Sequence, residues 1–202
     1  MALIPNNGWE TGTAGGWTFG NGSLGSAPTL ITAASGNAAV RSGTYALRLP
    51  VAVSETTPTV LYDVLTPSDW VGYKIVWRAY GRRAPNNSGT RDLRLGITAS
   101  PDAAVNADLA VIDAFTVTSV TVTVPAACTL IRLTMSLSGT GGTVWNVDDM
   151  EVEVQDAGGN IVFKSDLDIQ PGAAAGVASY GGEVDWDADG VWTESGNAIT
   201  TA

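Results

Sequence analysis

The stretch Val144-Trp-Asn-Val-Asp-Asp-Met-Glu-Val-Glu-Val154 alternates apolar and polar residues as a β-strand does, but the alternation slips once. Its apolar residues form two sets of opposite parity: Trp145 and Val147, then Met150, Val152 and Val154. Successive strand side chains point to opposite faces, so both sets reach one face only if an extra residue lies between them. We therefore predict a strand with a β-bulge at Asp148-Asp149.

The two adjacent carboxylates at this bulge have two interpretations. Bulges often re-aim a side chain at a site, and a pair of carboxylates suits a cation. The alternative is two solvated aspartates at a kink in the strand. The spacing alone leaves both open.

Other segments also show the period of two that is typical of strands. Inward-facing sets of alternate apolar residues are expected at Tyr45–Val51, around residues 60–65, at 73–79 with Trp77 buried, at Leu93, Leu95 and Ile97, at 120–124, and at Ile131, Leu133, Met135 and Leu137. Turn signals such as Asn7-Gly8 and Asn21-Gly22 separate short apolar pieces near the N-terminus. This pattern predicts an all-β fold, an antiparallel jelly-roll β-sandwich.

Composition supports one well-buried core in a chain of 202 residues with 24 glycines and a net charge of −10. The acidic balance argues against a nucleic-acid partner, because phosphates are neutralised by a basic face. No apolar run approaches the length of a membrane span, and the N-terminus lacks the charged and apolar regions of a signal peptide. The single cysteine, Cys128, excludes an internal disulfide and is expected to be a buried filler.

The chain contains no histidine. Ser–His and Cys–His nucleophilic pairs and histidine metal sites are therefore absent. Carboxylate pairs suited to glycoside hydrolysis remain possible, but no spacing singles one out. We expect a protein that is not an enzyme.

Residues 155–202 lack the regular series of alternating strands that precedes them. They contain a turn, a short strand at 161–163, a Gly/Ala-rich stretch and a predicted β-hairpin over 183–194 with Trp186 and Trp192 beside its turn. We predict a sandwich over 1–154 and a short, irregular C-terminal extension over 155–202. Within it, Asp185, Asp187 and Asp189 match the first half of a calcium loop, but Gly196 stands where the closing glutamate belongs. A turn with solvated acids is the favoured interpretation, and a second metal site is the alternative.

Half of the basic residues gather around one predicted hairpin: Arg78, Arg82, Arg83, Arg91 and Arg94. Such a group can dock on an acidic partner, including a second copy of the chain. Equally, the arginines can lie along the strand surface with their stems as cover.

Three motifs in this order resemble the family 4 and 9 carbohydrate-binding modules, which are calcium-containing jelly rolls. They are Ile4-Pro-Asn-Asn-Gly-Trp-Glu-Thr-Gly12 followed by Gly16-Trp17, then Ser42-Gly-Thr-Tyr-Ala-Leu-Arg-Leu49, then Val144–Val152. The resemblance implies a structural calcium between the first and last strands. On matching positions its ligands would be the Gly8 carbonyl, the Glu10 carboxylate, a carbonyl in residues 42–45 and Asp148.

The same resemblance implies aromatic rings that bind a glycan, with Trp17, Trp70 and Tyr80 as candidates. Trp17 belongs to the opening motif, so core packing is the expected role for it.

Two functions compete. The first is a non-catalytic structural protein of a virus particle, most plausibly a bacteriophage capsid-decoration or tail protein, located in the virion and assembled in the host cytoplasm. Its partners would be other virion proteins and copies of itself. This expectation rests on an analogy of architecture: phage proteins reuse such sandwiches, begin at their own Met, lack disulfides and carry terminal extensions. The alternative is a stand-alone carbohydrate-binding module that recognises a polysaccharide.

Overall fold

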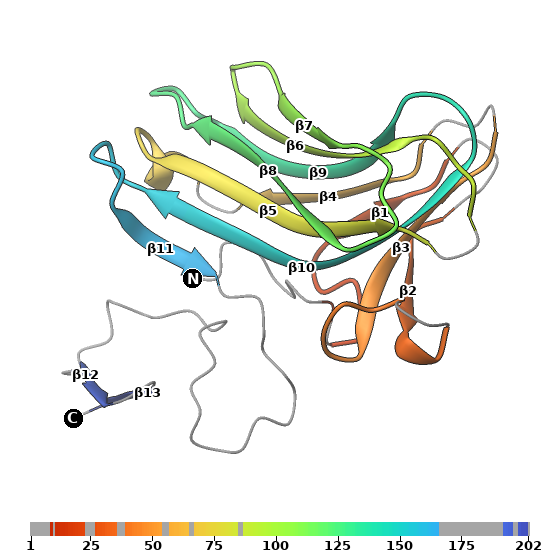
Figure 1. Cartoon of the computed structure of the whole chain (residues 1–202). Helices are drawn as coiled ribbons and strands as arrows, with labels where there is room; N and C mark the ends of the chain where they lie inside the picture. The colour runs from red at the N-terminus through yellow and green to blue at the C-terminus, as the bar shows by residue number, and fades with distance from the viewer. Residues whose placement is uncertain are drawn as a thin grey trace.

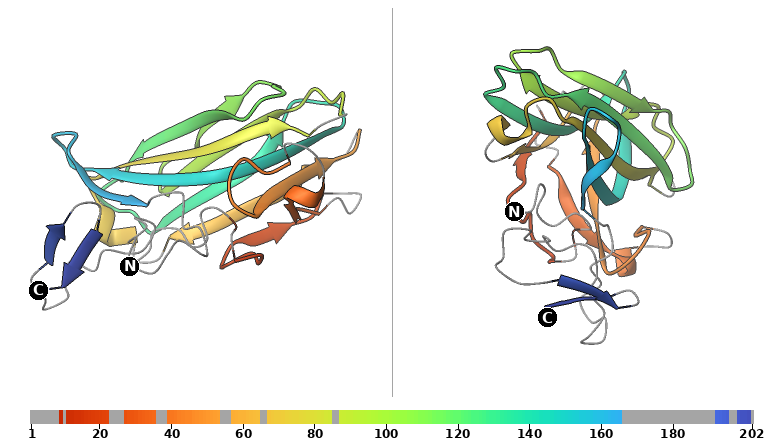
Figure 2. Two further views of the ribbon diagram at one scale, coloured as in Figure 1. Left: turned by 60° about the horizontal axis from the view of Figure 1, so that its bottom comes forward. Right: turned by 90° about the vertical axis from the view of Figure 1, so that its left-hand side faces the viewer.

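A computed structural model describes residues 9, 11–22, 27–35, 39–53, 57–64, 67–84, 87–165, 192–195 and 198–201. Most of these residues form two antiparallel sheets that lie face to face (Figures 1 and 2). Among them the only helical pieces are two short 3-10 turns, η1 (Ala33–Ser35) and η2 (Pro67–Trp70). The predicted all-β sandwich is confirmed.

Sheet A has the strand order β1-β4-β9-β6-β7. Its strands are β1 (Thr18–Gly20), β4 (Thr59–Val64), β9 (Leu130–Ser138), β6 (Asp92–Ser100) and β7 (Val105–Leu109).

Sheet B has the order β2-β3-β10-β5-β8, with β11 paired to β10. Its strands are β2 (Thr29–Thr32), β3 (Tyr45–Val51), β10 (Thr143–Gln155), β5 (Lys74–Arg83), β8 (Thr116–Thr123) and β11 (Ile161–Ser165).

The core lies between the sheets and consists of the apolar sets that the alternation predicts. The inward residues of β6 and β9 are buried, and Trp77 and Trp145 are fully buried. Burial of one face explains why these strands could be predicted, because a shift of one residue would turn every apolar side chain to solvent.

Three strands of the two sheets were not predicted: β1, β2 and β7. Each has at most five residues. In β7 the residues are exposed or half-buried, so the sequence carries no apolar alternation there.

The predicted hairpin that the five arginines would flank does not form. β5 pairs with β10 and β8 in sheet B, whereas β6 pairs with β9 and β7 in sheet A. The segment between β5 and β6 therefore crosses from one sheet to the other.

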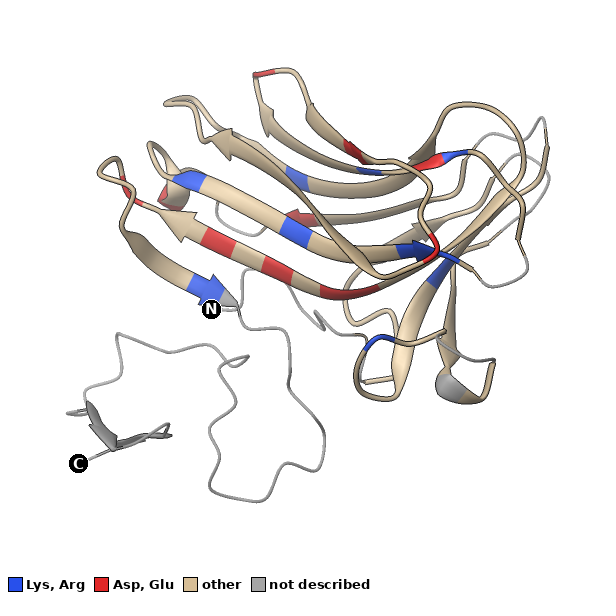
Figure 3. Cartoon of the chain, in the orientation of Figure 1, with Lys and Arg blue, Asp and Glu red and all other residues tan. Residues whose placement is uncertain are grey.

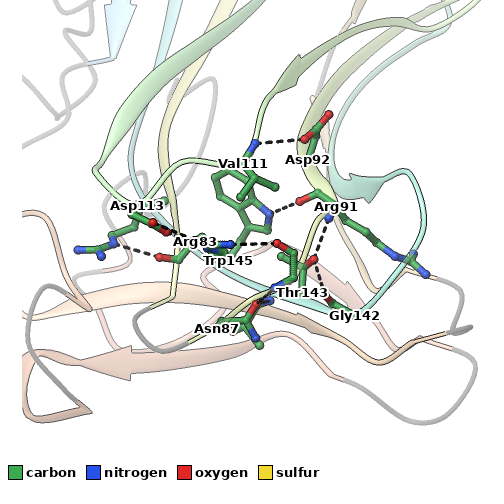
Figure 4. Close-up of polar contacts among 12 residues, drawn as sticks. Arg83, Asn87, Arg91, Asp92, Val111, Asp113, Gly142, Thr143 and Trp145 are labelled. Carbon is green, nitrogen blue, oxygen red and sulfur yellow. Dashed lines mark hydrogen bonds and ion pairs between the residues drawn. The ribbon is translucent and has the colours of Figure 1, made fainter.

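A polar network holds this crossing at one end of the sandwich (Figure 4). The buried Trp145 indole N–H donates to the Arg91 carbonyl at 2.8 Å, and the Arg91 backbone N–H donates to Thr143 Oγ1 at 2.8 Å. Arg83 donates to Asp113 from Nε and Nη2, both at 2.8 Å. The core tryptophan thus positions the loop by hydrogen bonding as well as by packing.

β10 is the longest strand and has two different edges. One edge pairs with β5 along residues 145–155. The other pairs with β3 at residues 143–147 and with β11 at residues 152–155, so residues 148–151 have no strand partner on that side. This gap is where the bulge lies.

β11 extends the sandwich beyond the predicted boundary after Val154. It pairs with the end of β10 from Val152 to Gln155, so residues up to 165 belong to sheet B rather than to a separate extension. Further on, β12 (Trp192–Ser195) and β13 (Ala198–Thr201) form a hairpin. The predicted hairpin over 183–194 overlaps this hairpin only at residues 192–194. Residues 183–191 lie outside the described part. No helix among the described residues is long and apolar enough to cross a membrane.

Candidate functional site

The bulge predicted at Asp148-Asp149 is present. The pairing of β10 with β5 shifts between Asp148 and Met150, and Asp149 adopts a left-handed backbone with φ 44°. Aspartate tolerates this region better than most residues with a side chain. The bulge restores the inward direction of Met150, which is fully buried.

Arg41 and Ser42 occupy the gap beside the bulge. Asp148 Oδ2 accepts hydrogen bonds from the backbone N–H groups of Arg41 at 2.8 Å and Ser42 at 3.2 Å. Asp149 accepts from the Ser42 hydroxyl at 2.6 Å and forms an ion pair with the Arg41 guanidinium. The two carboxylates therefore bind the segment before β3 to the middle of β10.

Asp148 is fully buried, and its carboxyl is difficult to ionise. Burial, together with the negative charge of Asp149, raises its pKa to about 7, although three backbone N–H donors act in the opposite direction. Arg41 supplies one positive charge for two carboxylates, and it pairs with Asp149. One negative charge of the site is thus left for a proton or a cation to neutralise.

The predicted calcium site can be tested only in part, because Gly8 and Glu10 lie outside the described residues. Asp148 Oδ1 accepts only from the Asp149 N–H, so it keeps one acceptor position among the described contacts. The described residues contain no group of three or more acidic, histidine or cysteine side chains that could hold a metal. The Asp148 carboxylate alone has the negative charge and the oxygen donors that calcium prefers. Calcium there remains a prediction, and it needs further oxygens from Gly8 and Glu10. The second predicted site, Asp185, Asp187 and Asp189, also lies outside the described part.

Two of the three aromatic candidates are covered by other side chains of the core or of the bulge segment. Trp17 is only 4% exposed and packs against Trp9, Tyr62 and Trp77, so it offers no ring face to a sugar. The Tyr80 ring is covered by the Arg41 guanidinium, 3.8 Å from its centroid. Both rings stabilise the protein itself.

Trp70 is half-buried and contacts Tyr73 and Phe163, with ring centroids 6.2 and 6.3 Å away. The group lies against the core at the end of the sandwich where β5 begins. Trp70 is thus half-buried like Tyr80, but its ring contacts are with two other aromatic rings rather than with a guanidinium.

Most of the five arginines predicted to contact a partner are paired within the chain. Arg78 binds Glu151 and Glu153, Arg83 binds Asp113, and Arg94 binds Asp108. Arg91 is buried and donates to the Gly141 carbonyl. Arg82 Nε donates to the Arg83 carbonyl, so all five arginines have acceptors within this chain, and their contact with a partner remains a prediction.

The outer face of sheet B is largely closed along its central strand. Four outward residues of β10 are at most 9% exposed, although they face away from the core: Asn146, Asp148, Glu151 and Glu153. Figure 3 shows these acids in line on β10 beside the basic residues of β5. A ligand therefore meets ion-paired or covered side chains along β10, whereas the outward residues of β8 are exposed.

The outer face of sheet A is open by comparison. Its outward side chains are half-buried or exposed on four adjacent strands, and we call this set the open face: Leu61 and Asp63 of β4, Arg132, Thr134 and Ser136 of β9, Arg94 and Thr98 of β6, and Asn106 and Asp108 of β7. Hydroxyl, amide and charged groups predominate, and the described part of this face carries no aromatic ring.

Two ion pairs organise the open face. Arg132 donates to both Asp63 oxygens, at 2.5 and 2.7 Å, and Arg94 donates to both Asp108 oxygens, at 2.7 and 2.8 Å. These hydrogen bonds, first among several causes, lower the pKa of Asp63 and of Asp108, so both are ionised at neutral pH. Each bidentate pair fixes a planar set of donors and acceptors on the surface.

The sequence contained only weak signs of the open face. Polar residues alternate with the buried ones in β6 and β9, so their outward direction follows from the period of two. Which acid meets which arginine does not, because Asp63 and Arg132 are 69 positions apart.

Comparison with known proteins identifies the fold but no family. No protein-family model matches the sequence, and no curated protein matches it. Among solved structures, similar chains include a family 61 carbohydrate-binding module in complex with β-1,4-galactotriose (TM-score 0.55, 16% identity, 75% of this chain and 97% of that chain). Module 2 of a family 16 carbohydrate-binding protein is also similar, with a TM-score of 0.53 and 14% identity. The match covers 74% of this chain and 98% of that chain. The family 22 xylan-binding domain of Paenibacillus barcinonensis Xyn10C (TM-score 0.53, 14% identity) covers 78% and 96%.

A bacteriophage protein is also similar. The enzymatically active domain of CBA120 tailspike protein 4 matches with a TM-score of 0.53 and 11% identity, over 76% of this chain and 21% of that chain. At these identities the likenesses show the fold alone: a jelly roll like that of carbohydrate-binding modules.

Proposed function

We propose that this chain is a non-catalytic glycan-binding module and that a polysaccharide lies across the open face of sheet A. The observation that carries the proposal is the pair of bidentate Arg–Asp contacts, Arg132–Asp63 and Arg94–Asp108, on an unobstructed face rich in hydroxyl groups. Sugar hydroxyls donate and accept hydrogen bonds, and groups held in place before binding lose little entropy on binding. The jelly-roll fold shared with galactotriose- and xylan-binding modules supports this choice over the virion role.

The absence of an aromatic ring from the described part of the open face sets the expected mode of binding. Stacking on a ring contributes much of the apolar contact in a sugar site. Here the ligand would be held by hydrogen bonds, which contribute about 0.5–1.5 kcal/mol each, or more when a partner is charged. We therefore expect modest affinity and a preference set by the positions of hydroxyl groups.

Affinity electrophoresis on soluble xylan and galactan tests the proposal. The native chain should be retarded by at least one of them, and Thr134→Val or Arg132→Gln should weaken retention about threefold to tenfold, the value of one hydrogen bond. Thr121→Val, at an exposed position on the outer face of sheet B, is the matched control. Equal retention of the Thr134 and Thr121 variants would refute the open face as the site, and retention lost only in Trp70→Ala would move the site to Trp70.

A structural role in a virus particle remains the second candidate. The one observation in its favour is the similarity to the tailspike domain, in which a comparable sandwich is about a fifth of a larger phage chain. Its partners would then be capsid or tail proteins and copies of this chain, with glycan binding as a means of attachment. A gene lying beside capsid or tail genes, together with the chain in purified virions, would support this role. Its absence from particles produced by the same genome would exclude it.

Calcium is part of the proposal as a stabilising ion. Gly8, Glu10 and Asp148 would hold it, and its positive charge would compensate the carboxylate that Arg41 leaves unpaired. The bulge would then be a point of stability, remote from the open face because it lies in the other sheet.

A further inference from the structure

Asn146 of β10 is an exception among the buried polar residues. It is 0% exposed, yet neither Nδ2 nor Oδ1 of its side-chain amide has a hydrogen-bond partner. A buried polar group left unpaired is destabilising, so native proteins pair most such groups. The Asn146 amide can therefore both donate to and accept from a ligand that reaches it.

Arginines stand on both sides of Asn146. It lies directly opposite Arg48 of β3 and Arg82 of β5, on the outer face of sheet B. Directly opposed residues have Cβ atoms about 5 Å apart, so two flexible guanidinium groups can meet over the amide. No acidic residue separates the three in this row.

Arg48 is the less compensated of the two arginines. It is half-buried, its Nε is buried without a hydrogen-bond partner, and it forms no ion pair with any described residue. Its neighbours in the loops are paired, since Arg41 binds Asp149 and Arg83 binds Asp113. Arg82 donates from Nε to the Arg83 carbonyl at 3.1 Å and has its guanidinium carbon 5.7 Å from the Phe115 ring centroid. Positive charge is thus concentrated beside the orphan amide.

We propose that Arg48, Asn146 and Arg82 form a binding site for the carboxylate of an acidic sugar, a uronate residue of a glycan. A carboxylate supplies the acceptor oxygens that guanidinium forks and the Asn146 Nδ2 require. The sugar hydroxyls beside it supply the donor that Asn146 Oδ1 requires. A simple oxyanion without a hydroxyl would leave Oδ1 unpaired. The inference rests on the proposed function in taking the ligand to be a glycan, but it uses a different face of the sandwich.

Access to the site depends on the arginine side chains. Asn146 has no exposed surface, whereas both flanking arginines are half-buried. A uronate would first meet the guanidinium groups and would reach the amide after they change rotamer. Long arginine stems allow such a change at small cost.

Calorimetric titration with trigalacturonate and with galactotriose tests the site, since the two sugars differ in their carboxylates. At low salt the native chain should bind the acidic sugar at least tenfold more tightly, and the preference should shrink as salt is added. Arg48→Gln should abolish the preference, and Arg48→Lys should restore it only in part because the planar fork is lost. Lys74→Gln is the matched control, since Lys74 is exposed on the same face of β5 and the change in charge is identical.

Asn146→Ala separates a ligand site from a structural role. Because neither amide atom has a partner, the variant loses no hydrogen bond and should melt within a few degrees of the native chain, while the preference for trigalacturonate disappears. Acetate, a carboxylate without hydroxyl groups, should not compete at concentrations where galacturonate does.

The possible outcomes distinguish this inference from the proposed function. Equal affinity for the two sugars, or a preference that survives both Arg48→Gln and Asn146→Ala, would overturn the inference alone. Preferential binding of trigalacturonate that depends on Arg48, together with equal retention of the Thr134 and Thr121 variants on the polysaccharides, would support the inference while refuting the open face. A native chain that binds neither sugar nor either polysaccharide would contradict both.

Discussion

Replacing Asp148 with asparagine should remove a pH dependence of stability that the native chain shows between pH 5 and 8 in metal-free buffer. Burial and the charge of Asp149 raise the pKa of Asp148 to about 7 in the folded state, far above the ordinary value of 3.8. The folded chain therefore keeps a proton that the unfolded chain has lost. Stability from this proton is fully present below pH 3.8 and is lost as the pH rises through 7.

The size of the effect follows from the two pKa values. A difference of one pKa unit corresponds to about 1.4 kcal/mol, and integration between pH 5 and pH 7 gives a loss of roughly 2 kcal/mol. For a chain of this length, 1 kcal/mol changes the melting temperature by about 2–4 °C. The native chain should thus melt roughly 4–8 °C lower at pH 7 than at pH 5, and Asp148→Asn should lack this component.

Thermal melts in EDTA at half-unit pH intervals measure the difference. Asp156→Asn is the matched control, because hydrogen bonds from Asn160 lower the pKa of that exposed carboxyl and its contribution is lost only in acid. The control should keep the native slope between pH 5 and 8. Equal slopes for the native chain and Asp148→Asn would refute the argument that burial leaves this carboxylate uncompensated.

Three further predictions concern stability. Trp145→Phe should lower the free energy of unfolding in urea by about 1–3 kcal/mol more than Trp77→Phe does, because Trp145 donates to the Arg91 carbonyl while the buried Trp77 indole N–H has no partner. Equal losses in the two variants would contradict the hydrogen-bond argument. Gly89→Ala should lower the free energy of unfolding by about 1–3 kcal/mol, since an added Cβ would lie 2.0 Å from the Gly142 carbonyl oxygen. Ser88→Ala, at the exposed neighbouring position, should change it by no more than about 0.5 kcal/mol. An unchanged Gly89 variant would show that the segments around Gly89 and Gly142 are not in close contact. Removal of calcium with EDTA should lower the melting temperature of the native chain but not of Glu10→Gln or Asp148→Asn, with about 1.4 kcal/mol gained per tenfold of free calcium above Kd; an unchanged native melt excludes the ion.

The bulge shows how far local pattern can be taken. The slip in parity between Val147 and Met150 placed it correctly, because burying one face of a strand leaves one arrangement that keeps all its apolar residues inside. The alternation could not predict which residues contact the bulge. Arg41 and Ser42 lie more than 100 positions before Asp148 and Asp149, and a gap between β3 and β11 admits them.

The arginines show the opposite case. Their closeness in sequence predicted a patch around a hairpin, but consecutive strands β5 and β6 belong to different sheets, so the patch is divided. Their partners come from strands that are adjacent only in the fold, such as Glu151 for Arg78, 73 positions away. Charge pairing depends on register between distant strands, which alternation does not specify.

The amino-acid sequence by itself determined the fold class, the inward faces of the long strands and the position of the bulge, because each follows from the period of two and from burial. Only the tertiary structure decided the strand order, the open face of sheet A and the row formed by Arg48, Asn146 and Arg82. These depend on which strands become neighbours, and β3, β5 and β10 are brought together by the closure of the sandwich, since no local preference links them.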